Sequence, residues 1–267
     1  IGTAIAALAA LPCAPLLIKD LGDPRRFHHM LRVFKPRSPM NLGSWTLTAY
    51  SGVLALAAWR EWTRGRRADA PTDGVKIADE FVDGVSDVAG IPLALLLAGY
   101  TGVLLSSTAT PVWSKNPWLG PLFSASAIGT GAAAIQLALE VADDSSTETP
   151  AKEALAKIDT AARCTEAVAL GGYLSSAGRL AEPLTRGKMA PHLWGGAVGA
   201  GLVAPELLER LPVRGKAWRW IKIAASALGL IGGFALRWAV LFAGHHSASD
   251  PEAAREASRA LDRKSGE

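Results

Sequence analysis

The run "VAGIPLALLLAGYTGVLLSSTATPVWS", residues 88–114, contains no aspartate, glutamate, lysine or arginine. A helix needs about 20 mostly apolar residues to cross the hydrocarbon core of a bilayer, which is about 30 Å thick. This run is long enough, and it carries a single tyrosine, Tyr100, well inside its apolar part. It predicts a membrane-spanning helix, so we interpret the whole chain as one that folds in lipid.

Similar apolar runs recur along the 267 residues, of which 49% are hydrophobic and only 19% are charged, with a mean hydropathy of +0.20. Three more runs are free of charge, and three others carry isolated charges. Together they predict an all-α, polytopic integral membrane helical bundle with about seven transmembrane helices. These further segments are Ile1–Ile18, Leu42–Trp59 and Asn116–Leu139, and approximately 155–176, 189–208 and 221–243.

The chain begins with Ile1, and its first apolar run lacks the basic segment with which a signal peptide starts. We therefore expect a helix already under way in a truncated chain, with an earlier helix missing. Cys13 and Cys164 both lie in apolar segments far apart in the sequence, which argues against a disulfide or a metal site. The net charge of +4 comes from cations in loops at helix ends, a pattern typical of headgroup anchoring and not of nucleic-acid binding.

If the helices cross the bilayer in alternation, their connections fall into two sets. Side A holds Lys19–Asn41, Thr110–Asn116, Gly178–Lys188 and the C-terminal tail, and side B holds the other connections. Side A connections are rich in proline, tryptophan and histidine, which favours a fixed, packed surface. All five histidines fall on side A or at helix ends that enter it; they are His28, His29, His192, His245 and His246.

Histidine titrates near neutral pH and can pass protons, and a buried phenol such as Tyr100 can donate a hydrogen bond to a carbonyl. Interfacial or backbone hydrogen bonding is the plainer role for each of them. An alternative role for histidine is to ligate haem b. No histidine lies near the middle of a predicted span, so only a haem at the membrane edge, bound among His28, His192 and His245, is possible. We expect neither haem nor an iron–sulfur cluster in this chain.

Three ionisable residues lie deep in apolar segments: Arg163, Glu166 and Arg237. A charge at that depth is unfavourable unless it has a partner or reaches water. We expect them to line a proton path toward side B, and a static ion pair that only fixes helix packing is the alternative. Glycines spaced by four, Gly195 with Gly199 and Gly229 with Gly233, predict close helix packing in lipid.

Three stretches resemble the NrfD/PsrC family of polysulfide-reductase-type membrane subunits. They are "DLGDPRRFHHMLRVFKPRSPMNLGSW" (residues 20–45), "GIPLALLLAGYTGVLLSSTATPVW" (90–113) and "GGFALRWAVLFAGHHSASD" (232–250). The resemblance implies eight helices in two packed bundles, of which the first is missing here. It therefore implies a transmembrane domain over residues 1–246 with a polar tail at 247–267, in the cell (cytoplasmic) membrane.

The resemblance further implies a site for menaquinone or ubiquinone, an iron–sulfur (ferredoxin-like) partner subunit, and a molybdopterin or haem catalytic subunit beyond it. Its quinone site would use Tyr100, His28, His29, Asp20 and Trp113. The first quoted loop would face the iron–sulfur partner, whose acidic surface its cations complement. Those cations are Arg25, Arg26, Arg32 and Lys35.

Asp20 and Arg26 have an equally good structural role in folding that loop through turns and salt bridges. Two other functions stay open at this point. A transporter or proton channel without quinone chemistry would use the deep charges, and a passive anchor would only tether a catalytic partner. The sequence does not decide whether the chain is itself an enzyme, and it identifies no catalytic residue.

Overall fold

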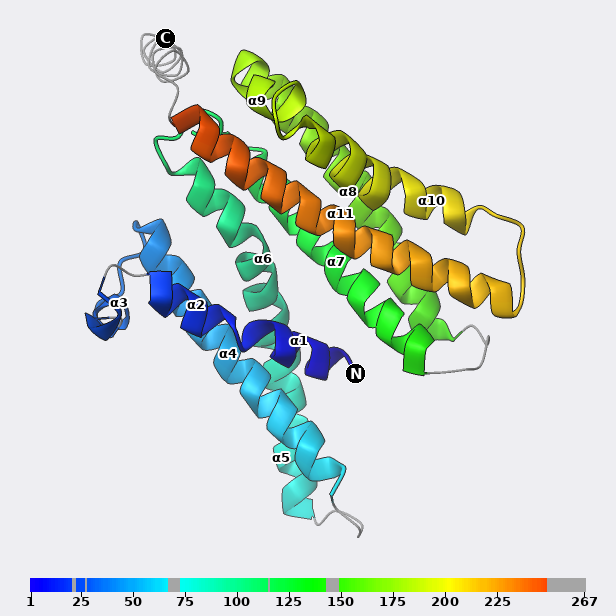
Figure 1. Cartoon of the computed structure of the whole chain (residues 1–267). Helices are drawn as coiled ribbons and strands as arrows, with labels where there is room; N and C mark the ends of the chain where they lie inside the picture. The colour runs from blue at the N-terminus through cyan, green and yellow to red at the C-terminus, as the bar shows by residue number, and fades with distance from the viewer. Residues whose placement is uncertain (21–22, 27, 67–72, 115, 143–148, 249–267) are drawn as a thin grey trace. The chain divides into compact units, whose positions relative to one another are not determined.

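The computed structural model describes residues 1–20, 23–26, 28–66, 73–114, 116–142 and 149–248, and within these ranges every regular element is helical. The all-α prediction is therefore confirmed (Figure 1). The chain divides into two compact units, unit 1 from Ile1 to Tyr100 and unit 2 from Thr101 to Glu267. The predicted tail lies almost wholly at 249–267, outside the described residues, while the last helix continues through Ala248.

Unit 1 is built on two long helical segments, α4 and the continuous stretch from α5 to α6, with shorter helices before them. A π-helical stretch, η2, joins α5 to α6, and α6 runs on into unit 2. The elements are α1 (Gly2–Ala10), α2 (Cys13–Asp20), η1 (Pro24–Arg26), α3 (His29–Arg32), α4 (Pro39–Arg64), α5 (Asp73–Val85), η2 (Ser86–Gly90) and α6 (Ile91–Ser106).

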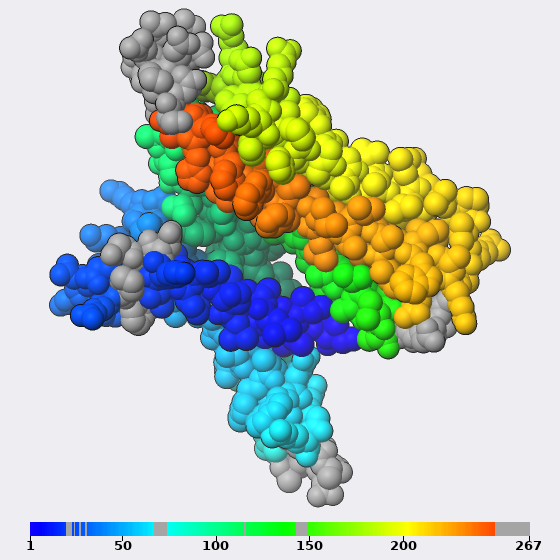
Figure 2. All heavy atoms as spheres, in the orientation of Figure 1, coloured from blue at the N-terminus to red at the C-terminus, as the bar shows by residue number. Residues whose placement is uncertain are grey.

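Unit 2 packs α7 against α8 and α11, and α11 also lies along the η4–α10 segment. Figure 2 shows the side chains of α11 and of η4–α10 directly against each other along this shared length. The elements are α7 (Leu119–Ala142), α8 (Pro150–Ala177), η3 (Gly178–Ala181), α9 (Glu182–Thr185), η4 (His192–Val203), α10 (Ala204–Glu209) and α11 (Lys216–Ala248).

Local sequence explains where two of the long helices begin. Ser38 and Thr149 are N-caps whose side-chain oxygens accept the backbone N–H groups of Asn41 (3.5 Å) and Lys152 (3.4 Å). A proline follows each cap, at the first helical position, where its missing N–H leaves no helical bond unmade. Gly178, with φ of +53°, follows the end of α8 in a conformation that favours glycine.

By length and apolar composition, four of the described helical segments can cross a membrane: Gly2–Lys19, Gly74–Ser106, Leu119–Ala142 and Lys216–Ala248. The second of them includes residues 88–106 of the uncharged run from which the membrane fold was predicted, and the rest of that run lies in the connection before α7. The other three predicted spans correspond to α4, α8 and the η4–α10 segment. Each of these is helical, and its crossing of the membrane stays a prediction.

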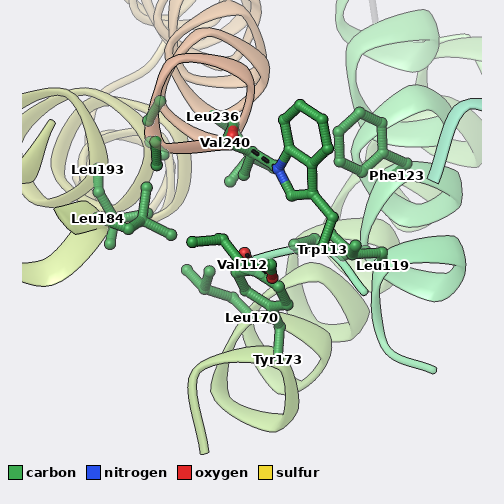
Figure 3. Packing of buried hydrophobic residues seen from close by; sticks show 14 of the residues in the cluster. Val112, Trp113, Leu119, Phe123, Leu170, Tyr173, Leu184, Leu193, Leu236 and Val240 are labelled. Carbon is green, nitrogen blue, oxygen red and sulfur yellow. Dashed lines mark hydrogen bonds between the residues drawn. The ribbon is translucent and has the colours of Figure 1, made fainter. Parts of the chain in front are cut away.

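The connection before α7 is fixed to the helices of unit 2 by buried polar contacts. The Trp113 Nε1–H donates to the Val240 backbone oxygen at 2.9 Å, and the Tyr173 hydroxyl donates to the Val112 oxygen at 3.2 Å (Figure 3). The Asn116 amide donates to the Ser176 hydroxyl at 2.8 Å. This connection is therefore a packed surface, as its tryptophan and proline content predicts.

Glycines allow close packing in unit 2 at one predicted position, Gly233, where a Cβ would lie 2.2 Å from Thr130 Cγ2 of α7, and at other positions that were not predicted. A Cβ on Gly232 would lie 2.1 Å from Gly201 Cα, so α11 and η4 meet backbone to backbone. By contrast, a Cβ on Gly195 would meet nothing within 4 Å, and one on Gly229 would make an ordinary 3.6 Å contact. The predicted pairing of Gly195 with Gly199 is wrong in register, because spacing along one helix does not show which face its neighbour covers.

Replacing Gly232 with alanine should destabilise unit 2, because the added methyl group meets the backbone of η4 and forces the two helices apart. Overpacking of this kind costs about 1–3 kcal/mol. Thermal unfolding of the full chain in detergent measures the loss. Gly229→Ala on the same helix is the matched control, and equal midpoints for the two variants would contradict the assigned contact.

Candidate functional site

The ring of Tyr100 packs on the backbone of α4 at Gly43. A Cβ built on Gly43 would lie 1.9 Å from Tyr100 Cζ, so only glycine leaves room for the ring. Tyr100 is half-buried, and no described residue forms a hydrogen bond with its hydroxyl. The structure therefore holds the ring in place and leaves its polar end available to a ligand.

A pocket of about 280 Å³ lies at the N-terminal end of the same helix. Asn41 shapes it: its Oδ1 accepts the Lys35 backbone N–H at 2.6 Å, and its Nδ2 donates to the Val33 oxygen at 3.0 Å. Asn41 precedes Gly43 by two residues, about 3 Å along the helix axis and about 200° around it, so the pocket and Tyr100 lie at the same end of α4 but Tyr100 does not line the pocket. The lining residues are His29, Val33, Lys35, Ser38, Met40 and Asn41.

The other residues predicted for a quinone site have different positions. The His28 ring lies edge-on to His29, with centroids 4.4 Å apart, beside the pocket-lining histidine. Asp20 ends α2, and its side chain lies outside the described part of the chain. Trp113 lies in the core of unit 2, where its N–H is bonded to Val240 and its ring packs on Gly244. Its participation in a site with Tyr100 stays a prediction.

The cations predicted to bind a partner lie on exposed residues of unit 1. Arg25, Arg32 and Lys35 are exposed, and Lys35 also lines the pocket. Arg26 forms an exposed ion pair with Asp23 at 3.1 Å, and exposed pairs of this kind contribute little to stability. Arg26 thus has the salt bridge that was considered as its structural role, but this ion pair is weak. The Arg26 side chain also stays exposed at the surface, where a partner can reach it.

In unit 2, Ser126 brings together two of the predicted deep charges. The Arg237 Nη1 donates to the Ser126 hydroxyl at 3.2 Å and to the Gly233 oxygen at 2.9 Å. Glu166 interacts electrostatically with Ser126 and with Arg237. Ser126 is fully buried and Glu166 is buried, so this group, with one residue each from α7, α8 and α11, is internal to the bundle.

Arg163, the third predicted deep charge, has carboxylate partners of its own. Its Nη2 lies 2.7 Å from the Glu209 carboxylate and 3.4 Å from that of Asp159. The same interior face of α8 carries Lys152, whose Nζ lies 3.3 Å from the buried Glu140 carboxylate of α7. The predicted requirement for a partner is therefore met at Arg163 by two carboxylates and at Arg237 by the Ser126 hydroxyl and the Gly233 oxygen.

Sequence reasoning missed Ser126, Asp159 and Glu209. The spacing of four between Asp159 and Arg163 is a local signal that could have identified their pairing on a helix. Glu209 lies 46 residues from Arg163, and Ser126 111 residues from Arg237, so these partners follow only from the tertiary fold. Among the described residues, no group of three or more histidine, cysteine, aspartate or glutamate side chains is placed to hold a metal ion.

A family model described as "Polysulphide reductase, NrfD" matches residues 1–247. Protein NrfD of Escherichia coli (strain K12) is 30% identical over 160 residues, which cover 57% of this chain and 50% of that protein. The chain thus spans about half the length of the curated relative it matches. No solved structure matches it.

Glu166 and Arg237 should stabilise the fold as a coupled pair. Glu166→Gln or Arg237→Gln alone leaves a buried charge without its counterpart and should cost about 2–4 kcal/mol, whereas the double variant should cost less than the sum. Thermal unfolding of the four proteins in detergent gives the coupling energy. The exposed Glu206–Arg210 pair, 2.7 Å apart, is the matched control and should show a coupling of about 0.5 kcal/mol or less. Additive effects at Glu166 and Arg237 would contradict the pairing.

Proposed function

The chain belongs to the NrfD family, and we propose that it is the quinone-reactive membrane subunit of a multi-subunit oxidoreductase. In this proposal it exchanges electrons between an iron–sulfur partner subunit and a menaquinone or ubiquinone pool in the cell membrane. A molybdopterin or haem subunit beyond the partner would supply the catalytic centre. The apolar spans make the chain a multi-pass membrane protein, within reach of a lipid-soluble substrate.

The observation that supports the proposal is that Tyr100 and a pocket both occur at the N-terminal end of α4. The Tyr100 hydroxyl is available to donate to a quinone carbonyl, and Val33 and Met40 give the pocket apolar walls. His29 and Lys35 add polar groups at the same place. A few polar groups among apolar walls are typical of sites for small, largely apolar ligands.

Quinone reduction needs protons as well as electrons. In our proposal the partner subunit supplies the electrons, and side chains of this chain transfer the protons. Electrons come from the partner's cluster, because this chain is expected to hold none. His29 can give or take a proton at the headgroup, since imidazole titrates near neutral pH. Within unit 2, Glu166 and Arg237 are the proposed proton path, extended by Arg163 one turn away; their burial around Ser126 supports it.

The same buried charges favour a second candidate function, that of a transporter or proton channel without quinone chemistry. Buried ionisable groups in spanning helices commonly mark ion or proton pathways. The two candidates differ in what unit 1 does. Only the first requires the end of α4 to bind a quinone headgroup.

Tyr100→Phe should weaken quinone binding about tenfold, because one hydrogen bond to the headgroup is lost while the ring remains on Gly43. Titration of the purified chain in lipid nanodiscs with a short-chain quinone measures the dissociation constant. Tyr50→Phe on α4 is the matched control, since Tyr50 is also half-buried within unit 1. An unchanged constant for Tyr100→Phe would argue against the site.

A second pair of variants tests the position of the ring. Gly43→Ala should displace Tyr100 and weaken quinone binding at least as much as the loss of the hydroxyl. Gly52→Ala lies on the same helix, where a Cβ meets nothing within 4 Å, and it should bind quinone as the unchanged chain does. Equal binding by the two glycine variants would show that the Tyr100 position does not matter to the ligand.

Reversal of Arg25, Arg26 and Arg32 to glutamate should release the iron–sulfur partner. These exposed cations would attract an acidic partner surface, and the reversed charges would repel it. Co-purification of the complex at low and at moderate salt measures the effect. Reversal of Arg210, Arg214 and Lys216, which are also exposed, is the matched control. A partner retained equally by both triple variants would exclude the loop as its binding surface.

A further inference from the structure

Asp159, Arg163 and Glu209 form a compact group between α8 and α10. One nitrogen, Arg163 Nη2, lies within 3.4 Å of the Asp159 carboxylate and 2.7 Å of the Glu209 carboxylate. The side chains of Arg163 and Asp159 are 8% and 12% exposed, and that of Glu209 is 24% exposed. Two carboxylates from different helices thus meet on one guanidinium, inside the unit.

The charges of this group do not balance. With every member ionised, one cation faces two anions, which leaves a net negative charge inside a helical bundle. Removing a net charge from water costs several kcal/mol, and neutralisation by a proton avoids that cost. Glu209 is moreover the last residue of α10, where the helix dipole disfavours a carboxylate.

Arg163 provides a second and independent observation. Its Nε and Nη1 are buried and have no acceptor among the described residues. Buried donors are rarely left unmatched in native proteins, and ordered water is their common partner in polar interiors. The guanidinium, whose Nη2 contacts both carboxylates, therefore offers the three N–H donors of Nε and Nη1 to water, which would connect the carboxylates for proton transfer.

We propose that Asp159, Arg163 and Glu209 constitute a proton-binding site, in which the two carboxylates share one proton that exchanges with solvent through Glu209. Protonation involves no redox step: the proton comes from water outside the unit, binds one carboxylate oxygen and leaves by the same route. Glu209 faces solvent more than its partners do, so it is the exchange point. Asp159, the more buried carboxylate, is the inner acceptor.

The charged neighbours of the site are consistent with this assignment. On α10, Glu206 adds a further negative field on Asp159, although its own carboxylate is bound to Arg210 at the surface. On α8, Glu166 lies one turn beyond Arg163 and interacts electrostatically with Asp159. From α7, the uncharged Gly129 lies beside Asp159, since a Cβ built on it would be 3.6 Å from the Asp159 carboxylate, and from α11 Arg237 interacts electrostatically with Glu166. The described neighbours therefore supply no second cation at Asp159.

The proposal does not depend on quinone chemistry, because a proton can bind here whatever unit 1 does. It differs from a static arrangement in which both carboxylates stay ionised on Arg163 and only hold α8 to α10. It also differs from a site for a metal cation, which would replace the proton between the same oxygens. Infrared spectroscopy separates these cases, since a protonated carboxyl group has a carbonyl band that a carboxylate lacks.

The experiment is a pH titration of the full chain in lipid nanodiscs, followed by infrared difference spectroscopy. We expect a protonated-carboxyl band that titrates and that is lost in both Asp159→Asn and Glu209→Gln. These amides keep the shape and the hydrogen-bonding oxygen, and circular dichroism at each pH shows that the variants are folded. Glu206→Gln is the matched control and should keep the band.

Three outcomes would overturn the proposal. The band could be absent from the unchanged chain, which establishes the static arrangement. It could persist in both Asp159→Asn and Glu209→Gln, which places the titrating proton on another group. Glu166→Gln then tests whether that group is Glu166. It could vanish on addition of sodium at constant pH, which identifies a metal cation as the occupant.

Discussion

Hydrocarbon does not solvate charge, and this constraint organises the interior of unit 2. Every deep ionisable residue described there lies with polar partners: Arg237 and Glu166 around Ser126, Arg163 between Asp159 and Glu209, and Glu140 with Lys152. Isolated, each of these charges would cost several kcal/mol in lipid. Their pairing lets α7 and α8 bury a polar face against one another while apolar side chains face the bilayer.

Close backbone approach is the second condition of the fold. At Gly232 and Gly201, two helices meet with no side chain between them, and at Gly43 the missing Cβ makes room for the Tyr100 ring. In lipid the hydrophobic effect does not press helices together, so contact at small residues and internal hydrogen bonds provide much of the association. The missing side chain of glycine thus lets helices pack closely in unit 2, and in unit 1 it positions Tyr100, the candidate ligand-binding residue.

The two units carry different chemistry. Unit 1 has the pocket, the exposed cations and a tyrosine with an available hydroxyl, which suit a ligand and a partner protein. Unit 2 has a set of ionisable groups inside, and it also holds the connection before α7, which Trp113 and Val112 fix to α11 and to Tyr173 of α8. Both units belong to one chain of the NrfD family. In our proposal, unit 1 binds the quinone and unit 2 provides the proton path.

The sequence by itself determined the helical class, four segments that are long and apolar enough to cross a membrane, and the positions where a buried charge must find a partner. These follow from chain-local physics: the length of an apolar run and the absence of water in lipid. Only the tertiary structure decided which partner each charge has and which glycines touch. Glu209 meets Arg163 and Ser126 meets Arg237 across 46 and 111 residues, and Gly232, not Gly229, faces η4. Helix rotation and crossing set those contacts, and no spacing within a single helix records them.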